Sequence, residues 1–480
     1  MAEQSLKDKT AKGLFWGGIS NGLQQLIGVI FGVFFARLLN QEDYGIVGTL
    51  AIFTGGVSLI QDSGFTSALI NKKEIKHEDY NAVFWFGLIT GIIIYIILFF
   101  CAPLIALFFK APELETVSRV LFLWFLIGGA GIAHNAILMK KLMVRERAKI
   151  YVTALILSNS VGLFLAFRGY AYWGLVIQTV VYSIAGTLLV WYYSPWRPTF
   201  QLNFRPLKDM FAFSSKLLIT GIFSLVNTNI FSVLLGHFYT KAELGDYSQA
   251  NKWTTMGYTF IGSILSSVAH PVLAEVSTDP KRQLAVFRKM MRFAAFISFP
   301  CMLGFAFVSQ ELIIILITDK WLASIPIMQL LCVWGAFIPI NSLYSFLFIS
   351  RGKSDINMWN VMAIGILQLI AAFFTLPYGI LTMVSVFVTL NILWLFVMHA
   401  FARRLVSYSL LAVFKDLLPF ALSAIAVIFC TYFLTMSIDN IYVRFCLKIS
   451  ICVALYMGIM KITNAKVFQE SIHFIFKHKK

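Results

Sequence analysis

The sequence is poor in charged residues. Only 13% of its 480 residues are Asp, Glu, Lys or Arg, whereas 59% are hydrophobic. Soluble globular chains carry about 25% charged residues, and a soluble chain this apolar lacks the polar groups to cover its own surface. The composition therefore excludes an ordinary soluble domain and indicates a chain whose solvent is the lipid bilayer.

Catalytic and metal-binding motifs are also missing. The six cysteines lie inside apolar runs, and no Cys-x-x-Cys pair or Cys/His cluster has the spacing of metal ligands. No phosphate-binding loop of the Walker type is present, so ATP hydrolysis by this chain is not expected. We therefore expect neither a metal nor a cofactor, and we expect that the chain is not an enzyme.

What the chain has instead is long apolar stretches. A transmembrane helix needs about 20 mostly apolar residues. The stretches that meet this need are 13–38, 44–70, 81–109, 115–138, 149–168, 171–193, 210–237, 244–275, 290–312, 324–349, 355–376, 379–402, 412–435 and 441–462. The loops between them are short, so no separate catalytic domain fits. The sequence predicts an all-α integral membrane fold of about fourteen transmembrane helices.

The basic residues alternate between the two sides of this predicted topology. Most of the 39 Lys and Arg residues lie in every second loop, for example in residues 140–149 and 281–292. Cytoplasmic loops are the ones enriched in Lys and Arg, so both termini are predicted to be cytoplasmic. The net charge of +17 is then a topology signal and an attraction to anionic lipid head groups, rather than a nucleic-acid site.

The two halves of the chain resemble each other. Residues 37–45 align with 237–245 at an offset of 200, and residues 82–84 align with 285–287 at an offset of 203. The matches keep their order and their hydropathy, which indicates a duplicated six-helix unit. Since six is an even number, the second copy enters the membrane from the same side as the first, and the repeats are parallel.

This duplication predicts the domain organisation. Residues 1–200 are predicted to form a first lobe of six helices, residues 201–405 a second lobe, and residues 406–480 two further helices with a cytoplasmic tail. Transporters built from such repeats place their substrate between the lobes, and rocking of the lobes gives alternating access.

Polar side chains gather in the first helix pair of each half. The candidates are Asn21, Gln25, Gln61, Asp62, Asn227, Asn229, Asp246, Gln249, Asn251 and Lys252. Polar groups in hydrocarbon are costly and usually face a cavity or a bundle interior. Amides offer both donors and acceptors to sugar hydroxyls, although they also hold helices together. Two roles are open for Asp62, namely a structural ion pair with Arg37 or titration in ion coupling.

Several short segments point to a family. They are FARLL at 35–39, DYG at 43–45, DSGF at 62–65 with ALI at 68–70, NAVFW at 81–85, APLIA at 102–106 and LGDYSQA at 244–250. In this order they resemble the Wzx-type polysaccharide flippases of the multidrug/oligosaccharidyl-lipid/polysaccharide exporter superfamily. The similarity is greatest to the colanic-acid and teichuronic-acid type exporters, and it covers roughly residues 10–460.

The resemblance implies a fold and a function. The fold is two lobes of six helices each, as in multidrug exporters and the lipid II flippase, with two more helices at the C-terminal end. The function is transfer of a polyprenyl-pyrophosphate-linked oligosaccharide from the cytoplasmic to the outer leaflet of the bacterial cytoplasmic membrane. In the family a cationic cavity holds the pyrophosphate, and Arg37, Lys216 and Lys252 are the candidates here. Membrane lipids, glycosyltransferases and a polysaccharide polymerase are the implied partners, and a proton or sodium gradient is a possible driving force.

Two other functions are open. A drug/cation antiporter of the same superfamily shares the lobes but has an acidic cavity, whereas amides and Lys252 accompany Asp62 and Asp246 here. A membrane-embedded glycosyltransferase or ligase needs a large extracytoplasmic loop or catalytic carboxylates, and the outer loops of this chain are short with scattered acids. The lipid II flippase is a near relative, from which only the head group of the substrate distinguishes it.

Overall fold

The protein is almost entirely helical. The computed structural model describes residues 2–61, 64–72 and 75–470, and in these ranges it contains helices and connecting segments but no β-strand. A helix satisfies its backbone hydrogen bonds internally, which is required where no water is available. The predicted all-α membrane fold is confirmed. The chain forms two compact units, Met1–Gly245 and Asp246–Lys480, here called unit 1 and unit 2.

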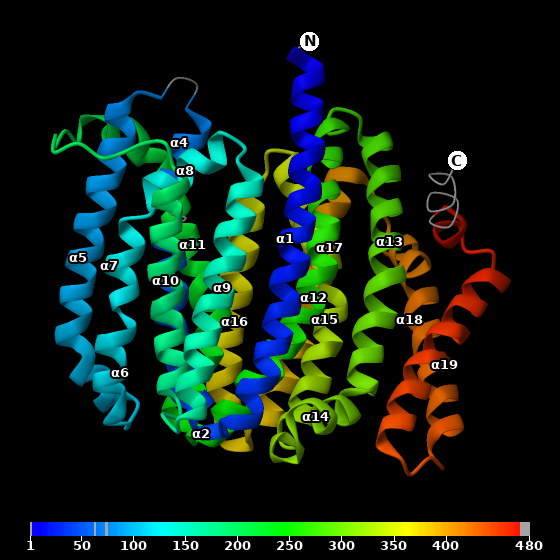
Figure 1. Cartoon of the computed structure of the whole chain (residues 1–480). Helices are drawn as coiled ribbons and strands as arrows, with labels where there is room; N and C mark the ends of the chain where they lie inside the picture. Colours follow the sequence, from blue (N-terminus) through cyan, green and yellow to red (C-terminus); the bar gives the residue numbers. More distant parts are fainter. Residues whose placement is uncertain (1, 62–63, 73–74, 471–480) are drawn as a thin grey trace. The chain divides into compact units, whose positions relative to one another are not determined.

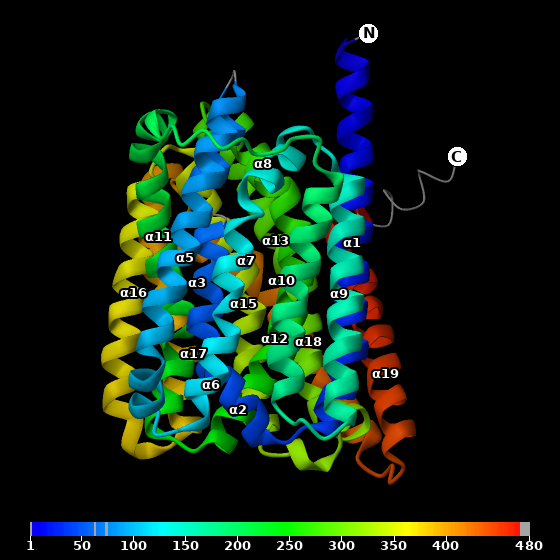
Figure 2. The same ribbon diagram turned by 60° about the vertical axis from the view of Figure 1, so that its left-hand side comes forward.

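Unit 1 holds the first eleven helices. They are α1 (Ala2–Leu38), α2 (Gln41–Thr49), α3 (Ala51–Gln61), α4 (Gly64–Asn71), α5 (His77–Phe108), α6 (Glu113–Leu121), α7 (Leu123–Gly129), α8 (Ile132–Lys140), α9 (Val144–Phe167), α10 (Trp173–Tyr193) and α11 (Arg205–Phe238). In Figures 1 and 2, α7, α10 and α9 run side by side, and α1 lies along α9 and extends beyond it at the N-terminus.

Unit 2 holds the remaining helices. They are most of α12 (Lys241–Glu275), then α13 (Pro280–Phe307), α14 (Ser309–Ile317), α15 (Ser324–Ser350), α16 (Ser354–Thr375), α17 (Ile380–Val406), α18 (Leu410–Thr435) and α19 (Ile441–Ile462), with short 3-10 turns at Asp319–Trp321 and Leu376–Tyr378. Helix α13 packs against α15 and α18, and α19 packs against α14 and α18. The two C-terminal helices are therefore attached to unit 2.

The predicted count of fourteen spans is not confirmed. Among the described residues, 11 helices are long and apolar enough to cross a membrane, or 12 if the pair Glu113–Gly129 and Ile132–Lys140 is one span bent by 49°. The predicted spans 44–70 and 244–275 fall on α2 to α4 and on α12. Helices α2, α3 and α4 are 9, 11 and 8 residues long, each too short to cross a membrane by itself. Helix α12 is long enough, but its polar side chains lower its mean hydropathy. Polar helices inside a bundle escape a count based on hydropathy alone.

Helix α11 belongs to unit 1 by its contacts. It packs against α2, α3, α4 and α5, and Leu207 and Met210 join the buried cluster around Leu69. At its other end His237 stacks on Phe108 with ring centroids 4.3 Å apart. The predicted division at residues 200/201 and 405/406 follows the sequence repeat rather than these contacts, and it stays a prediction.

The repeat is visible where equivalent segments meet. A Cβ atom on Gly45 would lie 2.0 Å from the carbonyl oxygen of Lys241, and a Cβ atom on Gly245 would lie 1.9 Å from the carbonyl oxygen of Gln41. Each residue in one contact is 200 positions from its counterpart in the other. Only glycine permits such an approach of two backbones. The start of α2 and the start of α12 therefore cross symmetrically, as parallel repeats predict.

Candidate functional site

The sequence candidates on α1 lie along one side of unit 1. Asn21 is exposed and Gln25 is half-buried one helical turn further on. Arg37 is exposed in the last turn of the same helix. Asn21 and Arg37 are 16 positions apart on α1, roughly 24 Å along the helix axis at about 1.5 Å per residue, so the structure places these candidates on one helix without bringing them into a single cluster.

The candidates on α11 face in part toward α3. Asn227 and Asn229 are half-buried. The Asn229 amide nitrogen donates to the Leu225 carbonyl at 3.0 Å and lies 3.5 Å from the position of a Cβ atom on Gly55 of α3. Asn229 therefore contributes polar surface at the α3–α11 contact, which fits the helix-joining role as well as a cavity role.

Three further candidates lie outside the described residues or side chains. Asp62 is not among the residues that the structure describes. The structure describes the backbone of Gln61 and Lys216 but not their side chains. The hypothesis of an Asp62–Arg37 ion pair therefore stays a prediction.

The candidates of unit 2 occupy the first half of α12. Asp246 is 7% exposed, Gln249 and Trp253 are buried, and Asn251 and Lys252 are half-buried. Positions 246, 249 and 253 share one helical face. Neither the side-chain amide of Gln249 nor the Trp253 indole nitrogen has a hydrogen-bond partner among the described residues. A buried amide without partners is costly, so this face has unused capacity for a polar ligand.

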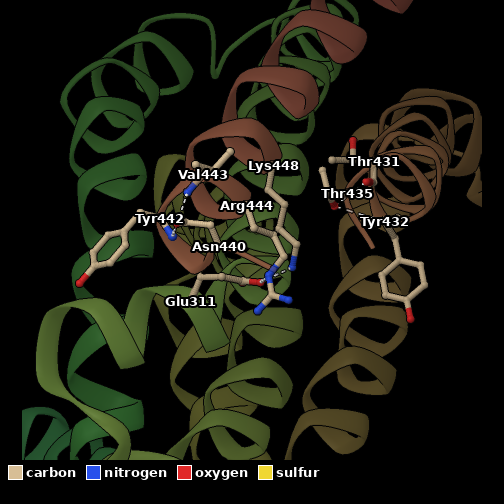
Figure 3. Close-up of polar contacts among 9 residues, drawn as sticks. All are labelled: Glu311, Thr431, Tyr432, Thr435, Asn440, Tyr442, Val443, Arg444 and Lys448. Carbon is tan, nitrogen blue, oxygen red and sulfur yellow. Dashed lines mark hydrogen bonds and ion pairs between the residues drawn. The ribbon is translucent and has the colours of Figure 1, made fainter. Parts of the chain in front are cut away.

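A buried charge cluster lies elsewhere in unit 2. Glu311 on α14 is 1% exposed, and its Oε1 atom lies 2.7 Å from Lys448 Nζ and 2.9 Å from Arg444 Nε, both on α19. Figure 3 shows the two cations directed at the one carboxylate. The Lys448 ammonium also lies 4.2 Å from the ring centroid of Phe307. The cluster fastens α14 to α19, a helix outside the repeat.

The predicted span 441–462 contains both Arg444 and Lys448, but the sequence does not identify their partner. Arg444 and Lys448 are four residues apart and so share a face of α19. Two cations on one face of a membrane helix indicate that an acidic side chain lies opposite them. The sequence does not say which acid, since Glu311 is 137 residues away along the chain.

A second charge cluster joins α13 to α18. The Asp416 carboxylate accepts hydrogen bonds from Arg288 Nε at 2.7 Å and Nη2 at 3.1 Å, and from the Tyr408 hydroxyl at 2.8 Å. Burial, and then the bond to Asp416, raises the pKa of Tyr408, which lies between α17 and α18. Bidentate Arg–carboxylate pairs are among the strongest hydrogen-bonded contacts. We therefore interpret this cluster as structural, holding α13 against α18.

Each unit contains a cavity large enough to hold a small molecule. One of about 370 Å³ lies between α13, α18 and α19 and is lined almost wholly by apolar side chains, with Lys448 on its wall. The other, of about 320 Å³, lies within unit 1 among α7, α8, α9 and α10 and has a mixed polar and aromatic lining. Among the described residues no group of three or more His, Cys, Asp or Glu side chains is placed to hold a metal ion.

Curated proteins of similar sequence act in polysaccharide biosynthesis. The chain is 24% identical over 424 residues to the teichuronic acid biosynthesis protein TuaB of Bacillus subtilis (strain 168), covering 88% of each chain. It is 23% identical over 359 residues to the lipopolysaccharide biosynthesis protein WzxC of Escherichia coli (strain K12), covering 74% of this chain and 72% of that protein.

Solved structures show a fold of the same kind. The lipid II flippase MurJ in an inward closed conformation matches 96% of this chain and 99% of its own, with a TM-score of 0.76 and 17% identity. An inward-facing multidrug resistance transporter of the MATE family matches 80% of this chain and 94% of its own, with a TM-score of 0.64 and 18% identity. At these identities the likeness concerns the fold alone.

The family itself follows from the sequence. The sequence model of the polysaccharide biosynthesis protein family matches residues 34–326, more than half of the chain. This range contains both copies of the Gly45/Gly245 crossing and every candidate polar residue of α11 and α12. The chain is a multi-pass membrane protein that belongs to the polysaccharide biosynthesis protein family.

Proposed function

We propose that this protein is a flippase that moves a polyprenyl-pyrophosphate-linked oligosaccharide from the cytoplasmic to the outer leaflet, for the synthesis of a cell-surface polysaccharide. The observation that carries the proposal is the family match over residues 34–326. It is supported by relatives named for teichuronic acid and lipopolysaccharide biosynthesis and by a fold like that of a lipid II flippase.

The candidate polar residues suit such a substrate. Sugar hydroxyls donate and accept hydrogen bonds, and the amides of Asn227, Asn229 and Gln249 do both. A diphosphate is costly to remove from water, and Arg or Lys side chains offset that cost. We propose that Arg37 and Lys252 contact the diphosphate at different stages of transport, with Lys216 as a third candidate. No chemical bond of the substrate changes in this function.

Location and driving force belong to the same proposal. The bacterial relatives and the basic loops favour the cytoplasmic membrane with both termini inside. Glycosyltransferases that build the repeat unit and a polymerase that consumes it are the expected partners. Coupling to a proton or sodium gradient stays a prediction.

Reconstituted vesicles test the proposal. We expect wild-type protein to transfer a fluorescent polyprenyl-pyrophosphate oligosaccharide between leaflets, and Lys252→Ala and Arg37→Ala to slow the transfer at least about tenfold, the loss of about 1.4 kcal/mol of interaction. Arg168→Ala is the matched control, because Arg168 is also a helix-end arginine but lies over Phe164. Imposed proton and sodium gradients show which ion, if either, drives transfer.

The alternative functions give different results in the same vesicles. Extrusion of small organic cations without movement of the glycolipid would identify an antiporter and overturn the flippase proposal. Formation of a new glycosidic bond on the lipid would identify a transferase. Equal rates for Arg168→Ala and Lys252→Ala would remove Lys252 from the proposed diphosphate contacts.

A further inference from the structure

The cavity within unit 1 is built by two helical faces. Residues 124, 128, 131 and 135 follow one face of the bent α7–α8 span, and residues 182, 183, 186, 187 and 190 follow one face of α10. Ile150 and Tyr151 on α9 complete the wall. The three helices α7, α9 and α10 lie beside one another in Figures 1 and 2. A volume of about 320 Å³ is at the lower end of the range for small-molecule sites, about 300–1,000 Å³.

The lining has the chemistry of a sugar site. Trp124, Tyr151 and Tyr182 supply aromatic surface, and Asn135, Ser183 and Thr187 add amide and hydroxyl groups; all six line the cavity. Aromatic rings pack against the apolar faces of sugar rings, while amides and hydroxyls bond to the hydroxyl groups at the ring edge. A lipid chain in this space would leave the buried Asn135 side-chain oxygen without a partner.

Two buried polar atoms, one in the cavity wall and one beside it, lack hydrogen-bond partners. The Asn135 side-chain oxygen and Arg147 Nε are buried, and neither has a hydrogen-bond partner among the described residues. Arg147 Nη2 lies 3.3 Å from the Tyr151 hydroxyl, so the guanidinium adjoins the cavity wall. Buried unsatisfied atoms are rare in native proteins, and a bound ligand is one way to satisfy them.

The cation-rich end of unit 1 lies at the same place. The segment from α8 to α9 carries Lys140, Lys141, Arg145, Arg147 and Lys149, with Glu146 as its one acid. Asn135 is near the end of α8, and Tyr151 is in the second turn of α9. Guanidinium groups bind phosphate through paired hydrogen bonds. The positive-inside rule assigns this end to the cytoplasmic face.

We propose that this cavity binds a glycosyl phosphate, with the sugar ring between α7 and α10 and the phosphate on Arg147. The site lies inside unit 1 and shares none of the candidate residues named above. If the flippase function holds, on which this inference rests for its biological source, the ligand is the first sugar of the lipid-linked oligosaccharide, taken up before transport. A soluble glycosyl phosphate has the same chemistry and is the other source.

Binding in lipid nanodiscs tests the site. The probes are polyprenyl diphosphate carrying glucose, galactose or N-acetylglucosamine, with sugar-free polyprenyl diphosphate as the reference and glucose 1-phosphate as a soluble competitor. We expect wild-type protein to bind at least one sugar-bearing lipid about tenfold tighter than the sugar-free lipid, as one or two added hydrogen bonds give. Competition by glucose 1-phosphate would assign the soluble source, and its absence the lipid-linked one.

Two variants test whether the preference for sugar-bearing over sugar-free lipid arises in the cavity. Gly186 lines it and has no atom within 4 Å of an added Cβ, so Gly186→Leu fills the space without a backbone clash. Gly458→Leu is the matched control, because Gly458 is a helical glycine with equally open surroundings in α19. Asn135→Ala removes the unpartnered side-chain oxygen with little change of volume, in case Gly186→Leu fails to fold. Arg147→Gln should weaken binding of both lipids.

The outcomes separate the site from the function. Loss of the sugar preference in Gly186→Leu or Asn135→Ala, with the preference kept in Gly458→Leu, would support the site. Equal binding of all the lipids by wild-type protein, or a preference that survives both cavity variants, would overturn it even if the protein flips the lipid. A sugar preference lost in the cavity variants, from a protein that flips nothing, would leave the site standing and overturn the flippase function.

Discussion

Glu311 depends on its partners more than any other acid described above. Its side chain is 1% exposed, and two cations from α19 share one of its oxygens. The other oxygen has no hydrogen-bond partner among the described residues. The cluster holds one negative and two positive charges, so removal of the acid takes this carboxylate from both cations, one of which, Lys448, lies on the wall of an apolar cavity.

We expect Glu311→Gln to lower the free energy of unfolding by about 3–5 kcal/mol, the usual cost of breaking a buried ion pair. Lys448→Met should cost less, because Glu311 keeps Arg444 as a partner. Unfolding by SDS titration in mixed micelles measures both. Asp439→Asn is the control, since Asp439 is an exposed acid in the α18–α19 turn. An equal effect of Glu311→Gln and Asp439→Asn would refute the role of the cluster.

At the scale of elements, the α2–α12 crossing brings two backbones together at Gly45 and Gly245. Helix α2 begins with a capping box in which Asn40 and Asp43 bond to each other's backbone nitrogens. Asp43 also accepts a hydrogen bond from the Tyr172 backbone nitrogen at 3.1 Å. The start of α2 is therefore held in place from two directions, and the backbone of Gly45 cannot easily move away from Lys241.

We expect Gly45→Ala and Gly245→Ala each to destabilise the protein by about 1–3 kcal/mol, as overpacking does, because each new Cβ would meet a backbone carbonyl at about 2 Å. Thermal unfolding in nanodiscs measures the change. Gly22→Ala in α1, where an added Cβ meets nothing within 4 Å, should leave stability unchanged or raise it slightly. Tolerance of alanine at both crossing positions would show that the two helices separate there at little cost.

At the scale of the whole molecule, the basic residues predict the topology. Most of the 39 Lys and Arg residues lie on one side of the predicted spans, and cytoplasmic loops carry such an excess. The α18–α19 turn, residues 436–440, is then outside, and the end of α19 is inside.

Reporter fusions measure this topology. We expect alkaline phosphatase fused at Ile438 to be active and fused at Lys466 to be inactive, because the enzyme matures only outside the cytoplasm. A fluorescent protein that folds only in the cytoplasm should give the opposite pattern. Activity of both phosphatase fusions, or of the Lys466 fusion alone, would contradict the predicted orientation of α19.

The sequence alone predicts the helical membrane fold and the repeat. Hydropathy over about 20 residues is a local property, so most spans were placed correctly, from α1 to α19. The count of fourteen is not confirmed at 44–70, which is divided among the short helices α2, α3 and α4, or at 244–275, where polar side chains lower the mean hydropathy of α12. The offset of 200 between Gly45 and Gly245 can also be found in the sequence. The structure explains why glycine stands at both positions, because a side chain at either one would meet a backbone carbonyl.

The tertiary structure decided which side chains meet. Glu311 and Lys448 are 137 positions apart, and the sugar-sized cavity of unit 1 takes its walls from four helices. Contacts of this kind depend on how helical faces pack, which periodicity along a single helix does not encode. The sequence therefore determined that this chain crosses the membrane as a duplicated helical unit, while packing decided where its buried charges and its polar cavity lie.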